Sequence, residues 1–364
     1  GNGKVKTVLV FGASGLVGTA AANSFSQAGW RVITCSRRRP TLLTQENHKH
    51  LQLDITDSAR CLEVLTGLDE DVSHVVYAAV QELPGLMPGW SDPDQIALNG
   101  EMLENVIEPL RLSNSLEHVS LLQGTKAYGG SIAPIRVLAR ESQDRVEHPN
   151  FYWLHEDYLK KISDQCGFSY TVFRPQLIVG PNHGVVMNLP PIVGVYAAMR
   201  KKEGLPLSFP GGADWVWEAV DVRLVGDACL WAAEAENAKG ETFNLTNGEV
   251  FSWRDMWPAI AETLCIEMGP EEPLSLADYL PERASMWTEI AIEHGLSEHS
   301  LESILGESHH YADLCFAYGS LSPPPPTFVS TIKIKQAGFT ETYDSEASFC
   351  YWLRDLQKRK VIPY

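Results

Sequence analysis

Three glycines near the N-terminus form the first pattern that could support chemistry. Gly12, Gly15 and Gly18 are spaced three residues apart and directly follow the apolar run 7–11. Glycines in such a turn let the backbone approach a pyrophosphate, whose negative charge is stabilised by the N-terminus of the following helix. A strand before the glycines and a helical pattern to about residue 28 after them predict a dinucleotide-binding turn.

Three consecutive arginines, Arg37 to Arg39, form the second pattern. They follow Ser36 and the apolar run 32–35, and no acid stands among them. In a βαβ dinucleotide-binding unit the end of the second strand faces the adenosine ribose. There an acid binds the hydroxyls of NAD, whereas arginine pairs with the 2′-phosphate of NADP. The arginines therefore predict NADP(H) as cofactor, with a solvated turn as the alternative.

The segments that must position these residues alternate between strand-like and helix-like. Strands are expected at 7–11, 32–35, 50–54, 72–79, 118–122 and 169–174, and helices at 58–66, 95–114 and 151–166. Six strands with intervening helices predict an α/β fold, a Rossmann-type doubly wound parallel sheet, with residues 1–180 as the NADP-binding domain. Residues 181–364 are expected to form a smaller, mainly helical substrate-binding cap, partly interleaved with the Rossmann core. Its helices are expected at 191–202, 222–235, 253–265 and 284–295, with a short strand at 242–245.

Composition narrows the class of protein. The 364 residues carry a net charge of −17, which argues against nucleic acid as a partner. No apolar run is long enough to span a bilayer, and the first residues lead straight into a strand, so we expect a cytoplasmic protein without membrane contact. The seven cysteines are scattered and contain no C-x-x-C, so we expect buried thiols and no metal site.

The glycine spacing is similar to that of the short-chain dehydrogenase/reductase superfamily, but the usual Y-x-x-x-K pair of that superfamily is missing. Tyr152 is followed four residues later by Glu156, and Tyr158 by Ile162. A lysine stands elsewhere: Lys126, in the sequence K-A-Y-G, comes just after the strand expected at 118–122. It lies where the active site of such a fold opens.

Several motifs together resemble the progesterone 5β-reductase/iridoid synthase-like enzymes, an atypical extended branch of this superfamily. They are the K-x-Y-G turn at Lys126, N-F-Y-x-x-x-E-D at 150–157, R-P-Q-L-I-V-G at 174–180, M-N-L at 187–189, F-N-L-T-N-G at 243–248 and V-I-P at 361–363. The resemblance covers nearly the whole chain and implies reduction of the C=C bond of an activated enone by NADPH.

The resemblance also implies roles for single residues. Tyr152 would stabilise the enolate oxygen as hydride reaches the β-carbon, and Lys126 would support Tyr152; a core tyrosine and a surface lysine are the alternatives. Cofactor contacts are expected from Gly12, Ser14, Gly15, Leu16, Val17, Gly18, Ser36, Arg37, Arg38, Asp54, Ile55, Ala78, Ala79, Gln123, Pro175 and Ile178. Asp54, which closes the expected third strand, would bind the adenine amine or be a plain loop aspartate.

The substrate pocket is expected to be apolar and to lie between the strand ends and the segments 181–190 and 208–220. His183, Met187 and Trp215 are its candidate residues, although His183 could instead cap a turn and Trp215 could anchor the core. The predicted partner is a hydrophobic small molecule, and a homodimer is left open. Other functions remain: a non-redox cyclase or isomerase that uses the same enolate-stabilising pocket, a non-catalytic NADP(H)-sensing regulator, and a nucleotide-sugar epimerase or dehydratase, which the missing Y-x-x-x-K disfavours.

Overall fold

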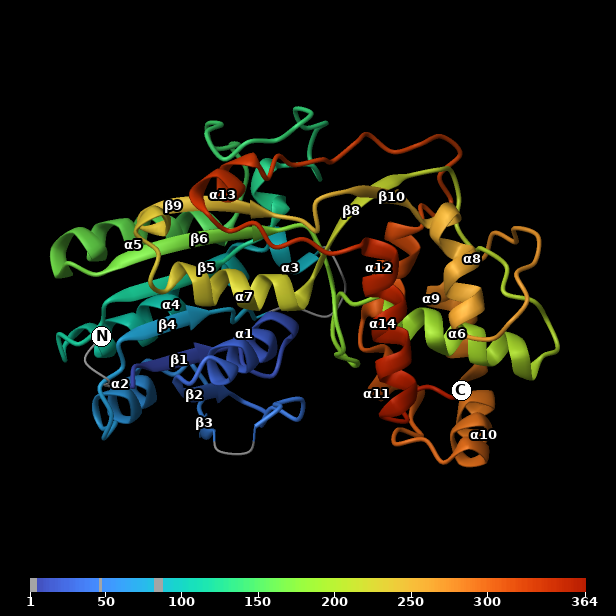
Figure 1. The fold of residues 1–364 in the computed structure, drawn as a ribbon, viewed down its shortest axis with the longest axis horizontal. Coiled ribbons are helices and arrows are strands. Elements are labelled where there is room, and N and C mark those ends of the chain that lie inside the picture. The colour runs from blue at the N-terminus through green and yellow to red at the C-terminus, as the bar shows by residue number, and fades with distance from the viewer. Residues whose placement is uncertain (1–4, 46–47, 82–87) are drawn as a thin grey trace. The chain divides into compact units, whose positions relative to one another are not determined.

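Seven parallel strands form the main sheet of the computed structural model, which describes residues 5–45, 48–81 and 88–364 (Figure 1). Their order across the sheet is β3-β2-β1-β4-β5-β6-β9. The strands are β1 (Thr7–Phe11), β2 (Arg31–Ser36), β3 (Lys49–Gln52), β4 (His74–Tyr77), β5 (His118–Leu122), β6 (Ser169–Pro175) and β9 (Glu241–Leu245). This order is that of a doubly wound dinucleotide-binding fold, so the predicted fold class is confirmed.

Two details of the predicted sheet are wrong. The sheet has a seventh strand, because β9, expected within the cap, pairs in parallel with β6 and places Phe243 beside Phe173. The third strand ends at Gln52, so Asp54 does not close it. Asp54 instead accepts hydrogen bonds from the backbone and the hydroxyl of Thr56, and this local turn takes the chain out of the extended conformation.

Helices cover the sheet in two layers. α1 (Leu16–Gln27) packs on α7 (Val222–Ala232), while α2 (Ser58–Thr66) and α5 (Phe151–Cys166) both pack on α4 (Pro93–Arg111) (Figure 1). α1 and α7 approach closely because Gly226 has no side chain: a Cβ there would lie 2.7 Å from the carbonyl oxygen of Ala20. The short helix α13 (Ile332–Ala337) packs on β9.

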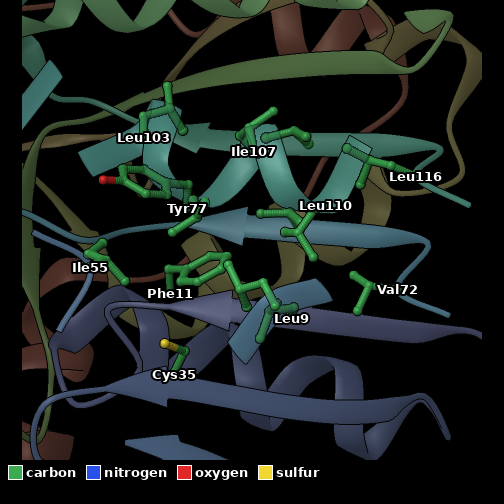
Figure 2. Close-up of a cluster of buried hydrophobic side chains, with 14 of the residues drawn as sticks. Leu9, Phe11, Cys35, Ile55, Val72, Tyr77, Leu103, Ile107, Leu110 and Leu116 are labelled. Carbon is green, nitrogen blue, oxygen red and sulfur yellow. The ribbon is translucent and has the colours of Figure 1, made fainter. Parts of the chain in front are cut away.

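The main core lies between the sheet and the layer of α2, α4 and α5. Figure 2 shows Leu103, Ile107 and Leu110 of α4 above Phe11 and Tyr77 of the central strands. The α4 residues recur at the three- and four-residue spacing of a helix face, and the strands of a parallel sheet are apolar on both faces. Burial of such side chains contributes about 1.5–3 kcal/mol each, which stabilises the packing of α4 on the sheet.

The chain divides into two compact units. The first contains residues 1–176, 222–245 and 329–341, and the second contains 177–221, 246–328 and 342–364. The second unit has a small sheet of β7 (Leu177–Val179), β8 (Val216–Asp221) and β10 (Val250–Ser252) in the order β10-β8-β7. Its helices are α6 (Pro190–Lys202), α8 (Trp253–Thr263), α9 (Leu276–Tyr279), α10 (Ala284–His294), α11 (Leu301–Leu305), α12 (Ser308–Cys315) and α14 (Ser345–Lys358). The functional division at residue 180 stays a prediction.

Cysteine burial corrects one expectation. All seven cysteines are unpaired, but Cys166 and Cys265 are exposed, because each comes at or just after the end of a helix rather than on its packed face. Within the described residues, no helix combines the length and apolar character needed to cross a membrane.

Candidate active site

The glycine turn between β1 and α1 has two residues that the fold itself requires. Gly12 has a φ of +75°, and a Cβ on Gly18 would lie only 2.1 Å from the carbonyl oxygen of Gly12. Gly15 differs, because the nearest neighbour of a Cβ there would be 3.4 Å away. Gly15 is the N-cap residue of α1 and has no side chain to cap it. The first amide groups of α1 are therefore suited to an anion such as a pyrophosphate.

A cavity of about 370 Å³ opens beside this turn, within the first unit. Its volume is in the range of small-molecule and cofactor sites. Eight of the predicted cofactor residues line it: Gly12, Ser14, Ser36, Arg37, Arg38, Asp54, Ile55 and Ala79. They come from the ends of β1, β2 and β4 and from the turn after β3, as expected where parallel strands end at one edge of a sheet. Ala78 adjoins the cavity, because its amide donates to the carbonyl of Phe11.

The cavity carries both signs of charge. Arg37 and Arg38 are exposed at its border. Hydrogen bonds from Thr56 lower the pKa of the Asp54 carboxyl, and the charge of Arg37 lowers it further. The hydroxyl of Ser36 donates to the carbonyl of Arg38, which fixes the turn that bears both arginines. The arginine side suits a phosphate, and the Asp54 side suits a hydrogen-bond donor such as an amine.

Tyr152 lies at the start of α5, near the carboxyl ends of β5 and β6. The carboxamide oxygen of Asn150, the N-cap residue, accepts from the amide of Tyr152 at 3.0 Å and so starts the helix. The tyrosine side chain is 5% exposed. A Cβ on Gly124, just after β5, would lie 3.1 Å from the Tyr152 hydroxyl and 3.8 Å from the carbonyl oxygen of Pro175. The hydroxyl therefore reaches the edge of the sheet where ligands bind in open α/β folds.

Lys126 lies in the 3₁₀ turn η1 (Thr125–Tyr128), which follows Gly124. Its ammonium nitrogen is 3.5 Å from the centre of the Trp90 ring. Trp90 belongs to the short helix α3 (Pro88–Ser91); its ring stacks on Phe151 at 5.0 Å and meets Tyr152 edge-on at 5.5 Å. The structure thus places the predicted lysine and tyrosine against one shared indole ring.

Gln123 has its side chain committed to the protein. Its amide nitrogen donates to the backbone carbonyl of Tyr152 at 3.3 Å and to Glu156 at 3.1 Å, while its oxygen accepts from Arg174 at 3.0 Å. Gln123 and Arg174 are 7% and 6% exposed. These hydrogen bonds hold the backbone of Tyr152 in place. The predicted cofactor contact of Gln123 stays a prediction, as does that of Pro175, which ends β6.

The remaining predicted cofactor and pocket residues lie in α1 and in the second unit. Leu16 and Val17 begin α1 and are half-buried. Ile178, His183, Met187 and Trp215 all belong to the second unit. In that unit His183 lies 3.6 Å from the Glu298 carboxylate, and burial lowers the pKa of its imidazole. The cofactor role of Ile178 and the pocket roles of the other three remain predictions.

Trp215 has aromatic surroundings within the second unit. Its ring centre lies 4.4 Å from that of Trp217, and it lines a very small cavity together with Trp253 and Phe316. Trp217 itself anchors the core, because it is 8% exposed and its indole nitrogen donates to the carbonyl of Cys315.

Several site residues were not anticipated from the sequence. Gln81 and Met102 line the cavity beside the glycine turn, and Trp90 contacts both Lys126 and Tyr152. A lone aromatic residue in the proline- and glycine-rich stretch before α4 was the available signal for Trp90, since functional residues concentrate on loops held by a rigid scaffold. Nothing in the local pattern points to Met102, whose position on α4 is that of a core residue.

Residues 8–246 match the model of the NAD dependent epimerase/dehydratase family, and the chain belongs to that family. The resemblance to the progesterone 5β-reductase/iridoid synthase-like branch is also confirmed. The chain is 31% identical over 376 residues to (S)-8-oxocitronellyl enol synthase of Antirrhinum majus, covering 98% of this chain and 92% of that protein. It is 31% identical over 375 residues to the 3-oxo-Delta(4,5)-steroid 5-beta-reductase of Arabidopsis thaliana, with the same coverage of 98% and 92%.

Among solved structures, UDP-glucose 4-epimerase of Thermotoga maritima has the same fold, with a TM-score of 0.69, 16% identity, and coverage of 97% of this chain and 99% of that one. The chain is thus an NAD(P)-dependent enzyme of the extended short-chain dehydrogenase/reductase type.

Proposed function

We propose that the protein is an NADPH-dependent reductase of the C=C bond of an activated enone in a hydrophobic small molecule. The observation that carries the proposal is the placement of the Tyr152 hydroxyl and the Lys126 turn together at the carboxyl edge of β5 and β6. A phenol hydroxyl and a cation at one place can stabilise a developing oxyanion, which is the main demand of conjugate reduction.

The names of the two relatives support this chemistry. One relative acts on a 3-oxo steroid with a 4,5 double bond, which is a conjugated enone, and the other is an enol synthase of an oxo compound. Both names describe a carbonyl compound whose oxygen carries charge when an enolate forms. The Y-x-x-x-K pair typical of other short-chain enzymes is replaced in this chain by Tyr152 and the more distant Lys126.

The residues of the first unit fit NADP. The turn at Gly15 leaves the N-terminus of α1 accessible to a pyrophosphate, and the cavity beside it presents Arg37 and Arg38 for a 2′-phosphate and Asp54 for the adenine amine. When bound, the reduced nicotinamide would supply a hydride to the β-carbon of the substrate. Tyr152 would donate a hydrogen bond to the substrate carbonyl oxygen, and negative charge would build up on that oxygen as the double bond is lost. Lys126 would stabilise the same charge through space.

A kinetic comparison of two tyrosine variants on one helix tests the proposal. The rate of NADPH oxidation would be measured with a panel of cyclic and acyclic enones. Tyr152→Phe should lower kcat about 10²–10³-fold on a poorly activated enone, because one oxyanion donor is lost, with nearly unchanged NADPH affinity. Lys126→Ala should also lower kcat.

Tyr158→Phe is the matched control. Tyr158 is also on α5, but its hydroxyl donates to Glu108 at 2.6 Å and takes no part in the proposed site. Its loss should leave kcat near the wild-type value. Full activity of both Tyr152→Phe and Lys126→Ala on a poorly activated enone would contradict the proposed site. Tight NADPH binding without turnover on any enone would favour the sensing regulator instead.

A further inference from the structure

We propose that Trp90 is a positioning residue of this site, whose indole face holds the ammonium group of Lys126 beside Tyr152. The inference rests on the proposed function, because it concerns the support of the same oxyanion. It would make α3 part of the active site.

The first argument is the contact itself. The Lys126 nitrogen lies 3.5 Å from the centre of the Trp90 ring, which is direct contact with the ring face. Tryptophan is the aromatic residue that binds cations best, because its ring face carries the strongest negative potential. Lysine has a long, flexible side chain, and both Lys126 and Trp90 are half-buried, so the contact limits the positions that the ammonium can take.

The second argument is that the ring is itself held in place. Trp90 stacks on Phe151, with 27° between the ring planes, and meets Tyr152 at 80°. It also packs in one apolar cluster with Ile96 of α4. The N-cap residue of α4, Asp92, accepts from the amide of Gln95 at 3.3 Å and fixes the chain two residues after the ring. A ring supported from both α4 and α5 can define the position of a lysine.

A graded substitution series in two backgrounds tests the inference. Trp90→Phe and Trp90→Leu would be made in the wild type and in Lys126→Met, and kcat, KM and NADPH affinity measured with one enone. In the wild type, Trp90→Leu should lower kcat about 3- to 30-fold, Trp90→Phe should lower it less, and KM should change little. In the Lys126→Met background, the same Trp90 substitutions should change kcat by about twofold or less, because the cation is already gone.

The controls separate positioning from folding. Trp30→Leu removes a tryptophan that packs on Phe25 and His74, far from the carboxyl edge of the sheet, and should leave kcat unchanged. Thermal melts would show whether the Trp90 variants fold. If Trp90→Leu does not fold, Trp90→Phe still tests the inference. Equal losses of kcat in both backgrounds, a Phe variant no better than Leu, or a rise in KM alone would each overturn the inference.

A second readout does not depend on turnover. In protein with ¹³C-labelled lysine, the Cε protons of Lys126, assigned with Lys126→Met, should have an upfield ring-current shift that Trp90→Leu abolishes. An absent shift would overturn the inference. A clear shift in a protein that reduces no enone would leave the Lys126–Trp90 contact standing and show that the proposed function has failed.

Discussion

Arg37 and Arg38 border the cavity at the glycine turn, and Arg39 beside them provides an internal comparison. The three residues are adjacent and exposed, so they share solvent and sequence context. Only the first two are among the residues that the structure places around the cavity. A local island of positive charge in a chain of net charge −17 is the feature expected of a specific phosphate contact.

Replacing Arg37 and Arg38 by alanine should reduce the preference for NADPH over NADH at least about tenfold. Each charge-assisted hydrogen bond to the 2′-phosphate contributes about 1.5–3 kcal/mol, and NADH has no such group. The measurement is the ratio of dissociation constants for the two cofactors. Arg39→Ala is the control and should leave the ratio near that of the wild type. An unchanged ratio in the double variant would place the phosphate site elsewhere.

At the scale of elements, the start of α5 determines where the tyrosine hydroxyl lies. Asn150 is 6% exposed and caps the helix by accepting from the amide of Tyr152. Gln123, at the end of β5, holds the carbonyl of the same residue. Both backbone polar groups of Tyr152 are thus bound by neighbouring side chains, so its position depends on the junction of β5 with α5 rather than on the helix alone.

Asn150→Ala should therefore affect activity more than stability. Loss of an N-cap costs about 0.5–2 kcal/mol of the free energy of unfolding. A shift of the tyrosine hydroxyl by a fraction of an ångström should lower kcat about tenfold or more. Urea denaturation and steady-state kinetics measure the two effects.

Asp57→Ala provides the comparison for this cap. Asp57 is the N-cap of α2 and accepts from the amide of Arg60 at 3.1 Å. Its loss should lower stability by a similar or smaller amount, because it is exposed, and leave kcat unchanged. Parallel losses of kcat in both variants would show that the Asn150 effect is only global destabilisation.

At the scale of the whole molecule, buried histidines make stability depend on pH. In the first unit, burial lowers the pKa of His118 to about 3, with the charges of His74 and Lys239 acting in the same direction. Burial also lowers the pKa of His155 to about 4, against a hydrogen bond to the backbone of Asn99. Both side chains are neutral in the folded protein and take up a proton on unfolding below about pH 6.5.

The free energy of unfolding should thus fall as the pH falls. Because the unfolded chain binds more protons than the folded one, these two histidines should together remove about 3 kcal/mol between pH 6.5 and pH 5. His118→Gln should remove about half of this dependence, measured as urea denaturation midpoints across the pH range. The full stabilisation is present above about pH 7, where both histidines are neutral in the folded and in the unfolded chain. Identical pH dependence in the variant and the wild type would contradict the assignment.

Local features of the fold could be predicted well from the sequence. The helices at 58–66 and 151–166 and the strand at 118–122 lie where they were expected. Caps, periodicity and turn residues act between near neighbours, so they are written in short stretches of sequence. The glycine spacing and the arginines also come from neighbouring residues, and eight of the predicted cofactor residues line one cavity.

Long-range contacts were decided by the tertiary structure alone. β9 joins the main sheet because Phe243 and Leu245 are buried beside β6, a pairing that no local pattern specifies. Trp90 meets Lys126 because α3, α5 and η1 are brought together by packing. The spacing of neighbouring residues was enough to indicate candidate residues for chemistry and to predict the class of fold that carries them. Which of these residues share a cavity or a ring contact depended on packing between segments that are distant in the sequence. The free energy of such packing is a property of two segments together, so neither segment alone predicts it.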